Sequence, residues 1–198
     1  RKRMFNKEAD FENALIALLT TKSWEKEVLL YPTEEKLIAN WQEHLNKTNQ
    51  HIDKLDVPLL RTEMNQILEQ VQALKTPYAL NGFINGKTVA IKRENEKSRH
   101  FGKEVSLDIF DREEISAGKS RYQIAQQPQF TPRSDLYPKQ RGDLMLLING
   151  MPMFHIELKR SGVPISQATY QIERYHKAGA FSGIFSLVQV FVAMTPEE

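Results

Sequence analysis

Alternation of hydrophobic and polar residues marks the most informative stretch of the chain, between positions 141 and 175. Leu144 to Ile148 is an apolar run typical of a strand, and Asn149-Gly150 directly after it is a strong signal for a β-hairpin. From Met153 to Lys159 apolar and polar residues alternate, which predicts a half-buried second strand. The period of two places Glu157 and Lys159 on the same face of that strand.

Similar patterns predict the elements on either side. Apolar residues at helical spacing indicate helices that begin at Asn6 or Asp10, at Thr33 as N-cap, at Leu59 and at Pro164. The third of these is expected to stop at Pro77 and the fourth at Gly179. Further strands are expected at residues 27–31, 88–92, 105–110, 122–126 and 187–194. The last of these is an apolar run, so it is expected to be buried on both faces. Asn85-Gly86 is another hairpin signal. This order predicts an α/β fold with a central mixed sheet flanked by helices.

The hairpin carries a candidate for chemistry. Asp143 lies at its mouth and can reach the face that holds Glu157 and Lys159. Two carboxylates suffice to hold Mg²⁺, which prefers oxygen ligands and keeps several waters, and the bound ion promotes attack on a phosphodiester. Asp143 and Glu157 are the candidate metal ligands, and Lys159 would position the nucleophile or stabilise the phosphate. The alternative is a solvated strand face without a catalytic role.

The hairpin register decides whether the two carboxylates can meet. A plain two-residue turn with an unbroken ladder would pair Asp143 with Ile156 and place it on the apolar face. The chemistry requires Asp143 opposite or diagonal to Glu157, so the position numbers of opposed residues must add up to an even number. We therefore predict a bulge, or a turn of three or five residues. Asn149-Gly150-Met151 with Gly150 in a left-handed conformation is the first candidate.

At this point the sequence resembles a known family. Asp143, Glu157-Leu158-Lys159 and Gln171-x-x-x-Tyr175 look like the PD-(D/E)xK nuclease core of the restriction subunit of type I restriction endonucleases. The sequence segments around these residues also resemble that family, including D-L-M-L-L-I-N-G-M-P-M-F-H-I-E-L-K-R, Q-A-T-Y-Q-I-E-R-Y and F-S-L-V-Q-V-F-V. One departure is that Gly142 stands where the motif name has proline.

The resemblance implies a restriction-endonuclease-like core in a single endonuclease domain, residues 1–198. This domain would be the N-terminal part of a longer chain that continues into an ATP-driven DNA translocase. The implied activity is magnesium-dependent cleavage of double-stranded DNA, that of a type I site-specific deoxyribonuclease. The implied partners are a modification and a specificity subunit. Two other hypotheses stay open, a stand-alone repair or recombination nuclease with the same core and a non-catalytic DNA-binding or assembly module.

Three further features have two interpretations each. The resemblance makes Gln171 and Tyr175 accessory residues of the nuclease centre, whereas periodicity alone makes Tyr175 a core residue. Glu12, on the first helix, is either a third carboxylate of the metal site or, with Glu8, a solvated residue near the helix N-terminus. The charged run at residues 93–100 is typical of a solvated loop, with a DNA-contacting loop as the alternative.

Composition narrows the function classes. The chain has 198 residues, of which 40% are hydrophobic and 26% charged, and no cysteine, which excludes disulfides and a cysteine nucleophile. No apolar run is long enough to span a membrane, and the N-terminus has no apolar signal core, so a cytoplasmic protein is expected. The net charge of +2 is modest for a protein that holds DNA unaided, so either the basic groups lie on one face or other domains or subunits hold the DNA. Gly118-Lys119-Ser120 lacks the glycine of a phosphate-binding loop, because Glu113 takes its place, and a strand is expected next.

Overall fold

The computed structural model describes residues 4–85, 88–110 and 117–197. The chain divides into two compact units, one made of Arg1–Glu34 with Arg121–Glu198 and the other of Glu35–Ser120. The first unit contains α1 (Glu8–Thr20), β1 (Leu29–Leu30), β4 (Tyr122–Gln126), β5 (Gln129–Phe130), β6 (Gln140–Arg141), β7 (Leu144–Ile148), β8 (Met151–Leu158), α6 (Ser166–Lys177), a 3-10 helix (Gly183–Leu187) and β9 (Val190–Met194). The second is built from α2 (Glu34–Asn49), α3 (Arg61–Gln72), α4 (Pro77–Ile84), β2 (Thr88–Lys92) and β3 (Glu104–Asp108).

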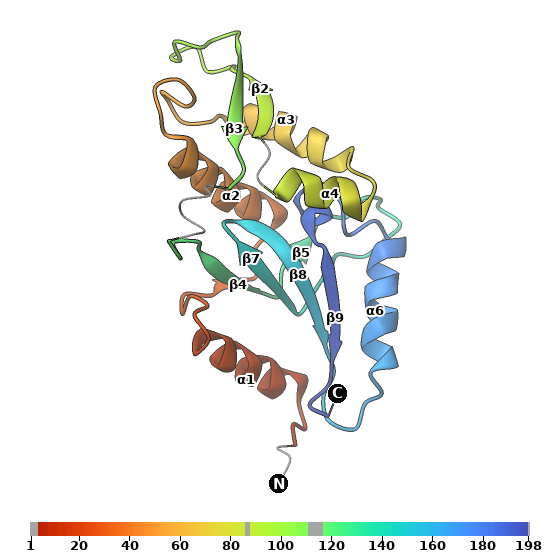
Figure 1. Cartoon of the computed structure of the whole chain (residues 1–198). Coiled ribbons are helices and arrows are strands. Elements are labelled where there is room, and N and C mark those ends of the chain that lie inside the picture. The colour runs from red at the N-terminus through yellow and green to blue at the C-terminus, as the bar shows by residue number, and fades with distance from the viewer. Residues whose placement is uncertain (1–3, 86–87, 111–116, 198) are drawn as a thin grey trace. The chain divides into compact units, whose positions relative to one another are not determined.

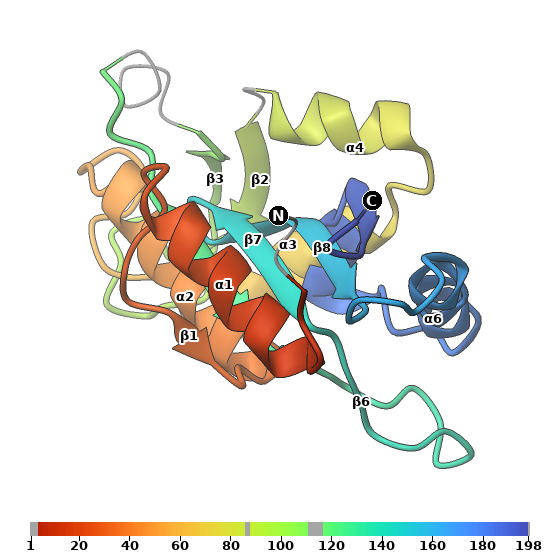
Figure 2. The ribbon, with the colours of Figure 1, turned by 90° about the horizontal axis from the view of Figure 1, so that it is seen from below.

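A five-stranded mixed sheet forms the centre of the first unit. Its strand order is β1-β4-β7-β8-β9. The β4–β7 and β7–β8 pairs are antiparallel, whereas β1–β4 and β8–β9 are parallel. Figure 1 shows α1 and α6 on opposite sides of this sheet, and Figure 2 shows them from below. The predicted α/β fold with a central mixed sheet flanked by helices is therefore confirmed.

The two faces of the sheet have different chemistry. On the α1 face, Phe11 packs against a buried cluster of aliphatic residues from β4, β7 and β8, namely Ile124, Leu144, Leu146, Ile156 and Leu158. On the α6 face, the buried residues of β8 include His155 and Glu157. This difference follows from the period of two along β8, because even positions there are apolar and two odd positions are polar.

The β7–β8 hairpin combines a tight turn with a bulge. Ile148 pairs with Met151, and both turn residues have positive φ, 50° at Asn149 and 82° at Gly150, as a type I′ turn requires. Met153 has no partner on β7, because the pairing shifts between Leu146 and Leu147. The predicted three-residue loop is therefore wrong, but the predicted bulge is present.

Beyond the bulge the register is the one that the chemistry requires. Leu144 pairs with Ile156, so the position numbers of opposed residues add up to an even number. The next pair in this register is Asp143 with Glu157, which places both residues on the α6 face.

Two other expectations need correction. Pro77 does not simply end a helix but begins α4, because the side chain of Thr76 accepts a hydrogen bond from the Ala79 N–H at 3.1 Å and caps it. The predicted strand at residues 187–194 is shorter and partly exposed, since β9 is an edge strand. Gly86 of the predicted Asn85-Gly86 hairpin lies outside the described residues, as does Glu113. Among the described residues, no helix is long and apolar enough to cross a membrane.

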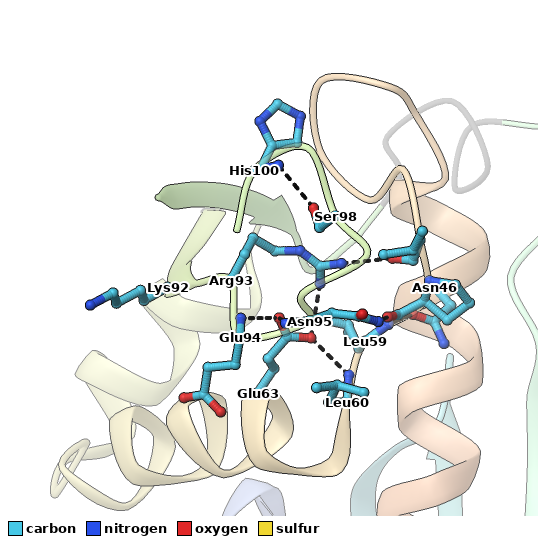
Figure 3. Close-up of polar contacts among 12 residues, drawn as sticks. Asn46, Leu59, Leu60, Glu63, Lys92, Arg93, Glu94, Asn95, Ser98 and His100 are labelled. Carbon is cyan, nitrogen blue, oxygen red and sulfur yellow. Dashed lines mark hydrogen bonds and ion pairs between the residues drawn. The ribbon is translucent and has the colours of Figure 1, made fainter. Parts of the chain in front are cut away.

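The second unit is organised by a buried ion pair (Figure 3). Arg93 Nη1 donates to Glu63 Oε2 at 2.9 Å, and both side chains are fully buried. Glu63 also accepts hydrogen bonds from the N–H groups of Leu60 and Glu94, each at 2.7 Å, and Arg93 donates to the Val57 carbonyl at 2.8 Å. The charged run at residues 93–100 is therefore not a plain solvated loop, because its first residue anchors it to α3.

This ion pair predicts a large and local effect on stability. Glu63→Ala would leave the Arg93 guanidinium buried without its counter-charge, so we expect the free energy of unfolding to fall by about 3–5 kcal/mol. Urea titration monitored by Trp41, which is fully buried in the same unit, measures it in a Trp24→Phe background. The control is Glu35→Ala, which removes an exposed ion pair with Arg61 and is expected to cost less than about 1 kcal/mol. Equal losses in the two variants would contradict the structural role of the buried pair.

Candidate active site

The hairpin brings Asp143 and Glu157 together at its open end. Asp143 directly precedes β7, and its Oδ2 atom accepts a hydrogen bond from the N–H of Leu158 at 2.7 Å. Its carbonyl oxygen accepts another from the N–H of Gln127, also at 2.7 Å. Glu157, near the end of β8, is only 3% exposed. The backbone therefore fixes the position of Asp143 beside a buried glutamate.

Both carboxyl groups have raised pKa values. Burial raises the pKa of Asp143 to about 7, and the charge of Glu157 adds to that shift. Burial also raises the pKa of Glu157 to about 7, although Lys159 and a hydrogen bond with Asp143 oppose the shift. Each group is thus costly to ionise in the absence of a further positive charge. Two hard oxygen donors with this property are suited to a divalent cation.

Lys159 lies at the same end of the sheet. Its N–H donates to the carbonyl of Met194 at 3.0 Å, which continues the pairing of β8 with β9 by one residue. Its Nζ atom lies 3.6 Å from Glu8 Oε1, and the positive charge lowers the pKa of both Asp143 and Glu157. The predicted trio of two acids and one lysine is therefore close enough to interact electrostatically.

Glu12 on α1 also acts on this site through its charge. It is 4% exposed, and its Oε1 atom accepts hydrogen bonds from the side-chain amides of Gln126 and Gln127, the latter at 3.2 Å. Its charge contributes to the raised pKa of Asp143. The interpretation of Glu12 as a solvated residue is therefore wrong, whereas Glu8 is the more exposed of the two and pairs with Lys159.

Helix α6 adds the Gln171 and Tyr175 pair. The Tyr175 hydroxyl donates to the carbonyl of Arg141 at 2.6 Å and lies 3.4 Å from Glu157 Oε1. Burial raises the Tyr175 pKa, and the charge of Glu157 raises it further, while a hydrogen bond with Gln171 opposes the shift. Tyr175 is thus both a buried residue of the helix and a neighbour of the acidic pair, so the two interpretations of the sequence are compatible.

His155 belongs to the same cluster, although the sequence analysis assigned it no role. It is fully buried, and its Nε2 atom lies 3.1 Å from Glu157 Oε2. Burial lowers its pKa to about 4, against the smaller opposing effect of Asp143. The available signal was its position two residues before Glu157, which places both side chains on one face of the strand.

Comparison with known proteins identifies the relatives of this chain. The family model for the type I restriction enzyme R protein N terminus matches residues 6–198. The endonuclease subunit of type I restriction enzyme SsaAORF53P from Staphylococcus saprophyticus is 30% identical over 190 residues, which cover 96% of this chain and 18% of that subunit. The endonuclease subunit of SauMSSORF170P from Staphylococcus aureus is 29% identical over 189 residues, 95% of this chain and 18% of that subunit.

A relative from Escherichia coli matches nearly the whole chain as well. The endonuclease subunit of type I restriction enzyme EcoprrI from Escherichia coli is 28% identical over 194 residues, which cover 95% of this chain and 56% of that subunit. The chain spans about a fifth of the length of the staphylococcal relatives. Because the family model covers nearly the whole chain, this protein belongs to the family of type I restriction enzyme R protein N termini.

Proposed function

We propose that this chain is the magnesium-dependent endonuclease domain of a type I restriction subunit and cleaves double-stranded DNA. The observation that carries the proposal is the meeting of Asp143 and Glu157 across a bulged hairpin, with Lys159 beside them. The names of the relatives support nuclease activity. In the complete cytoplasmic polypeptide, the domain would precede an ATP-driven translocase, and modification and specificity subunits would choose the DNA target.

The donor set fits a Mg²⁺ ion. Asp143 and Glu157 offer hard carboxylate oxygens, and the raised pKa values of these buried groups indicate that a nearby positive charge would stabilise their ionised forms. Within the described ranges, no three acidic, histidine or cysteine side chains form a ready-made metal cluster, so waters and phosphate oxygens would complete the coordination. When bound, the ion neutralises phosphate charge and lowers the pKa of a coordinated water.

The remaining residues of the site have separate roles in this proposal. Lys159 supplies a positive charge to the attacking water or to the phosphate in the transition state. The Leu158 N–H fixes one oxygen of Asp143. Tyr175 ties the β6 backbone at Arg141 to the site, and Gln171 orients its hydroxyl. The roles of Asp143, Glu157 and Lys159 come from their charge, and those of Gln171 and Tyr175 come from position.

Removal of any charged member of the site should abolish cleavage. We expect Asp143→Ala, Glu157→Ala and Lys159→Ala each to lower the DNA cleavage rate by ~10²-fold or more, because each contributes to charge stabilisation in the transition state. The assay uses the complete complex with Mg²⁺ and ATP, with circular dichroism to verify folding. The matched control is Asp135→Ala, an exposed acid in the β5–β6 loop, which should cleave normally. Full cleavage by a folded variant would remove that residue from the mechanism.

Substitutions in helix α6 should slow DNA cleavage without changing the ATP-dependent activities. We expect Gln171→Ala and Tyr175→Phe to slow DNA cleavage by about tenfold, because both residues act only by positioning Glu157. ATP turnover and translocation should remain unchanged. Tyr170→Phe on the exposed side of the same helix is the control. Loss of ATP turnover in a folded, assembled Gln171 or Tyr175 variant would indicate that the pair couples the domain to the translocase instead.

The raised pKa values predict a pH dependence of stability in the metal-free protein. Both carboxyls ionise near pH 4 when the chain is unfolded and near pH 7 when it is folded, so the folded state binds more protons between these values. The free energy of unfolding should therefore decrease as the pH rises from about 4 through about 7. Urea titrations with EDTA measure this slope, which should be shallower in the Asp143→Asn, Glu157→Gln double variant. An identical slope in the two proteins would contradict the raised values.

A further inference from the structure

His155 makes one polar contact that matters for the proposed site. His155 Nε2 lies 3.1 Å from Glu157 Oε2. A glutamate that binds a metal ion is ionised and only accepts hydrogen bonds, so in that state His155 Nε2 is the donor. The other ring nitrogen, Nδ1, is buried and has no hydrogen-bond partner among the described residues. Burial of an unpaired nitrogen is unfavourable. The bond to Glu157 is therefore the polar interaction that orients this ring.

Aromatic side chains hold the imidazole from several sides. The ring centroid of His155 lies 5.2 Å from that of Phe181, 5.8 Å from Tyr175, 5.9 Å from Phe130 and 6.5 Å from Phe191. Tyr175 also lies near the other oxygen of Glu157, at 3.4 Å. The two oxygens of the carboxylate are thus contacted by different side chains, Oε2 by the imidazole and Oε1 by the phenol.

Gly142 completes this arrangement. A Cβ atom on residue 142 would overlap Cε1 of His155 and lie 3.1 Å from its Nδ1 atom. The imidazole cannot move away freely, because the aromatic rings surround it. Any larger residue at position 142 would therefore displace the histidine, and this includes the proline that the motif name has at the position before Asp143.

These contacts lead to a proposal that rests on the proposed nuclease function. We infer that His155 is a positioning residue that holds the Glu157 carboxylate in its metal-binding orientation. Gly142 is its steric complement, and the two form a matched pair that replaces the proline of the motif. His155 is fully buried and contacts Glu157, so its effect would reach the reaction only through that carboxylate.

Substitutions that separate volume from hydrogen bonding test the role of His155. In the complete complex, His155→Phe fills the aromatic surroundings but has no donor, whereas His155→Gln places an amide donor at a similar reach. We expect His155→Phe to raise both the Mg²⁺ concentration for half-maximal cleavage and the Kd for Mn²⁺ in calorimetry without ATP by about tenfold. His155→Gln should restore most of that affinity. Tyr170→Phe, an exposed change on α6 that does not contact the imidazole, should leave both values unchanged.

A double-mutant cycle tests the pairing with Gly142. Gly142→Ala should weaken Mn²⁺ binding when His155 is present and should have little further effect in a His155→Ala background, where the ring is absent. Additive effects would show that Gly142 acts independently of the histidine.

The outcomes separate this inference from the proposed function. Unchanged metal dependence in a folded His155→Phe variant, or equal defects in His155→Phe and His155→Gln, would overturn the positioning role even if Asp143→Ala is inactive. Full cleavage by Asp143→Ala would instead overturn the nuclease site itself. If His155→Phe does not fold, His155→Leu takes its place in the comparison with His155→Gln.

Discussion

The β-bulge at Met153 is the feature on which the rest of the site depends. The type I′ turn at Asn149-Gly150 by itself would pair Asp143 with Ile156 and place the aspartate on the apolar α1 face. One extra residue on β8 shifts the pairing, so Asp143 opposes Glu157 on the α6 face. The carbonyl of Met153 accepts a hydrogen bond from the N–H of Gln189 at 3.0 Å, so the chain before β9 helps to hold the bulged strand.

The register places two acidic groups where ionisation is unfavourable. The Leu158 N–H contacts Asp143, while His155 and Tyr175 lie beside Glu157. These neutral groups orient the carboxyls but do not supply a full positive charge. Lys159 supplies one, shared with Glu8, and the pKa values of both acids nevertheless remain near 7. A bound cation would stabilise the ionised forms of both acids, and this supports the proposed chemistry.

Much of this arrangement could be predicted from the sequence, because it depends on local periodicity. The alternation along β8 predicted that Glu157 lies on the opposite face from Ile156 and Leu158, and the even-sum requirement predicted a bulge or an odd turn. The sequence could not show which of these occurs, since a bulge depends on neighbours such as Gln189 that are distant in the chain. For the same reason, the apolar run that ends in β9 did not distinguish an edge strand from a buried one.

The other incorrect or missing predictions have the same cause, which is contact with residues outside the local sequence pattern. Arg93 belongs to a charged run, and its burial depends on Glu63, thirty positions earlier. Pro77 is compatible with either the end or the start of a helix, and the Thr76 cap decides between them. His155 has no motif of its own, because its role comes from the space left by Gly142 and from aromatic residues of other elements.

The most direct test of the central claim is a crystal structure of the protein soaked in Mn²⁺, with the ion located by anomalous scattering. The account predicts one anomalous peak in contact with carboxylate oxygens of both Asp143 and Glu157, and no such peak in Asp143→Asn crystals. A peak that contacts neither residue, or two carboxylates on opposite faces of the sheet, would contradict it.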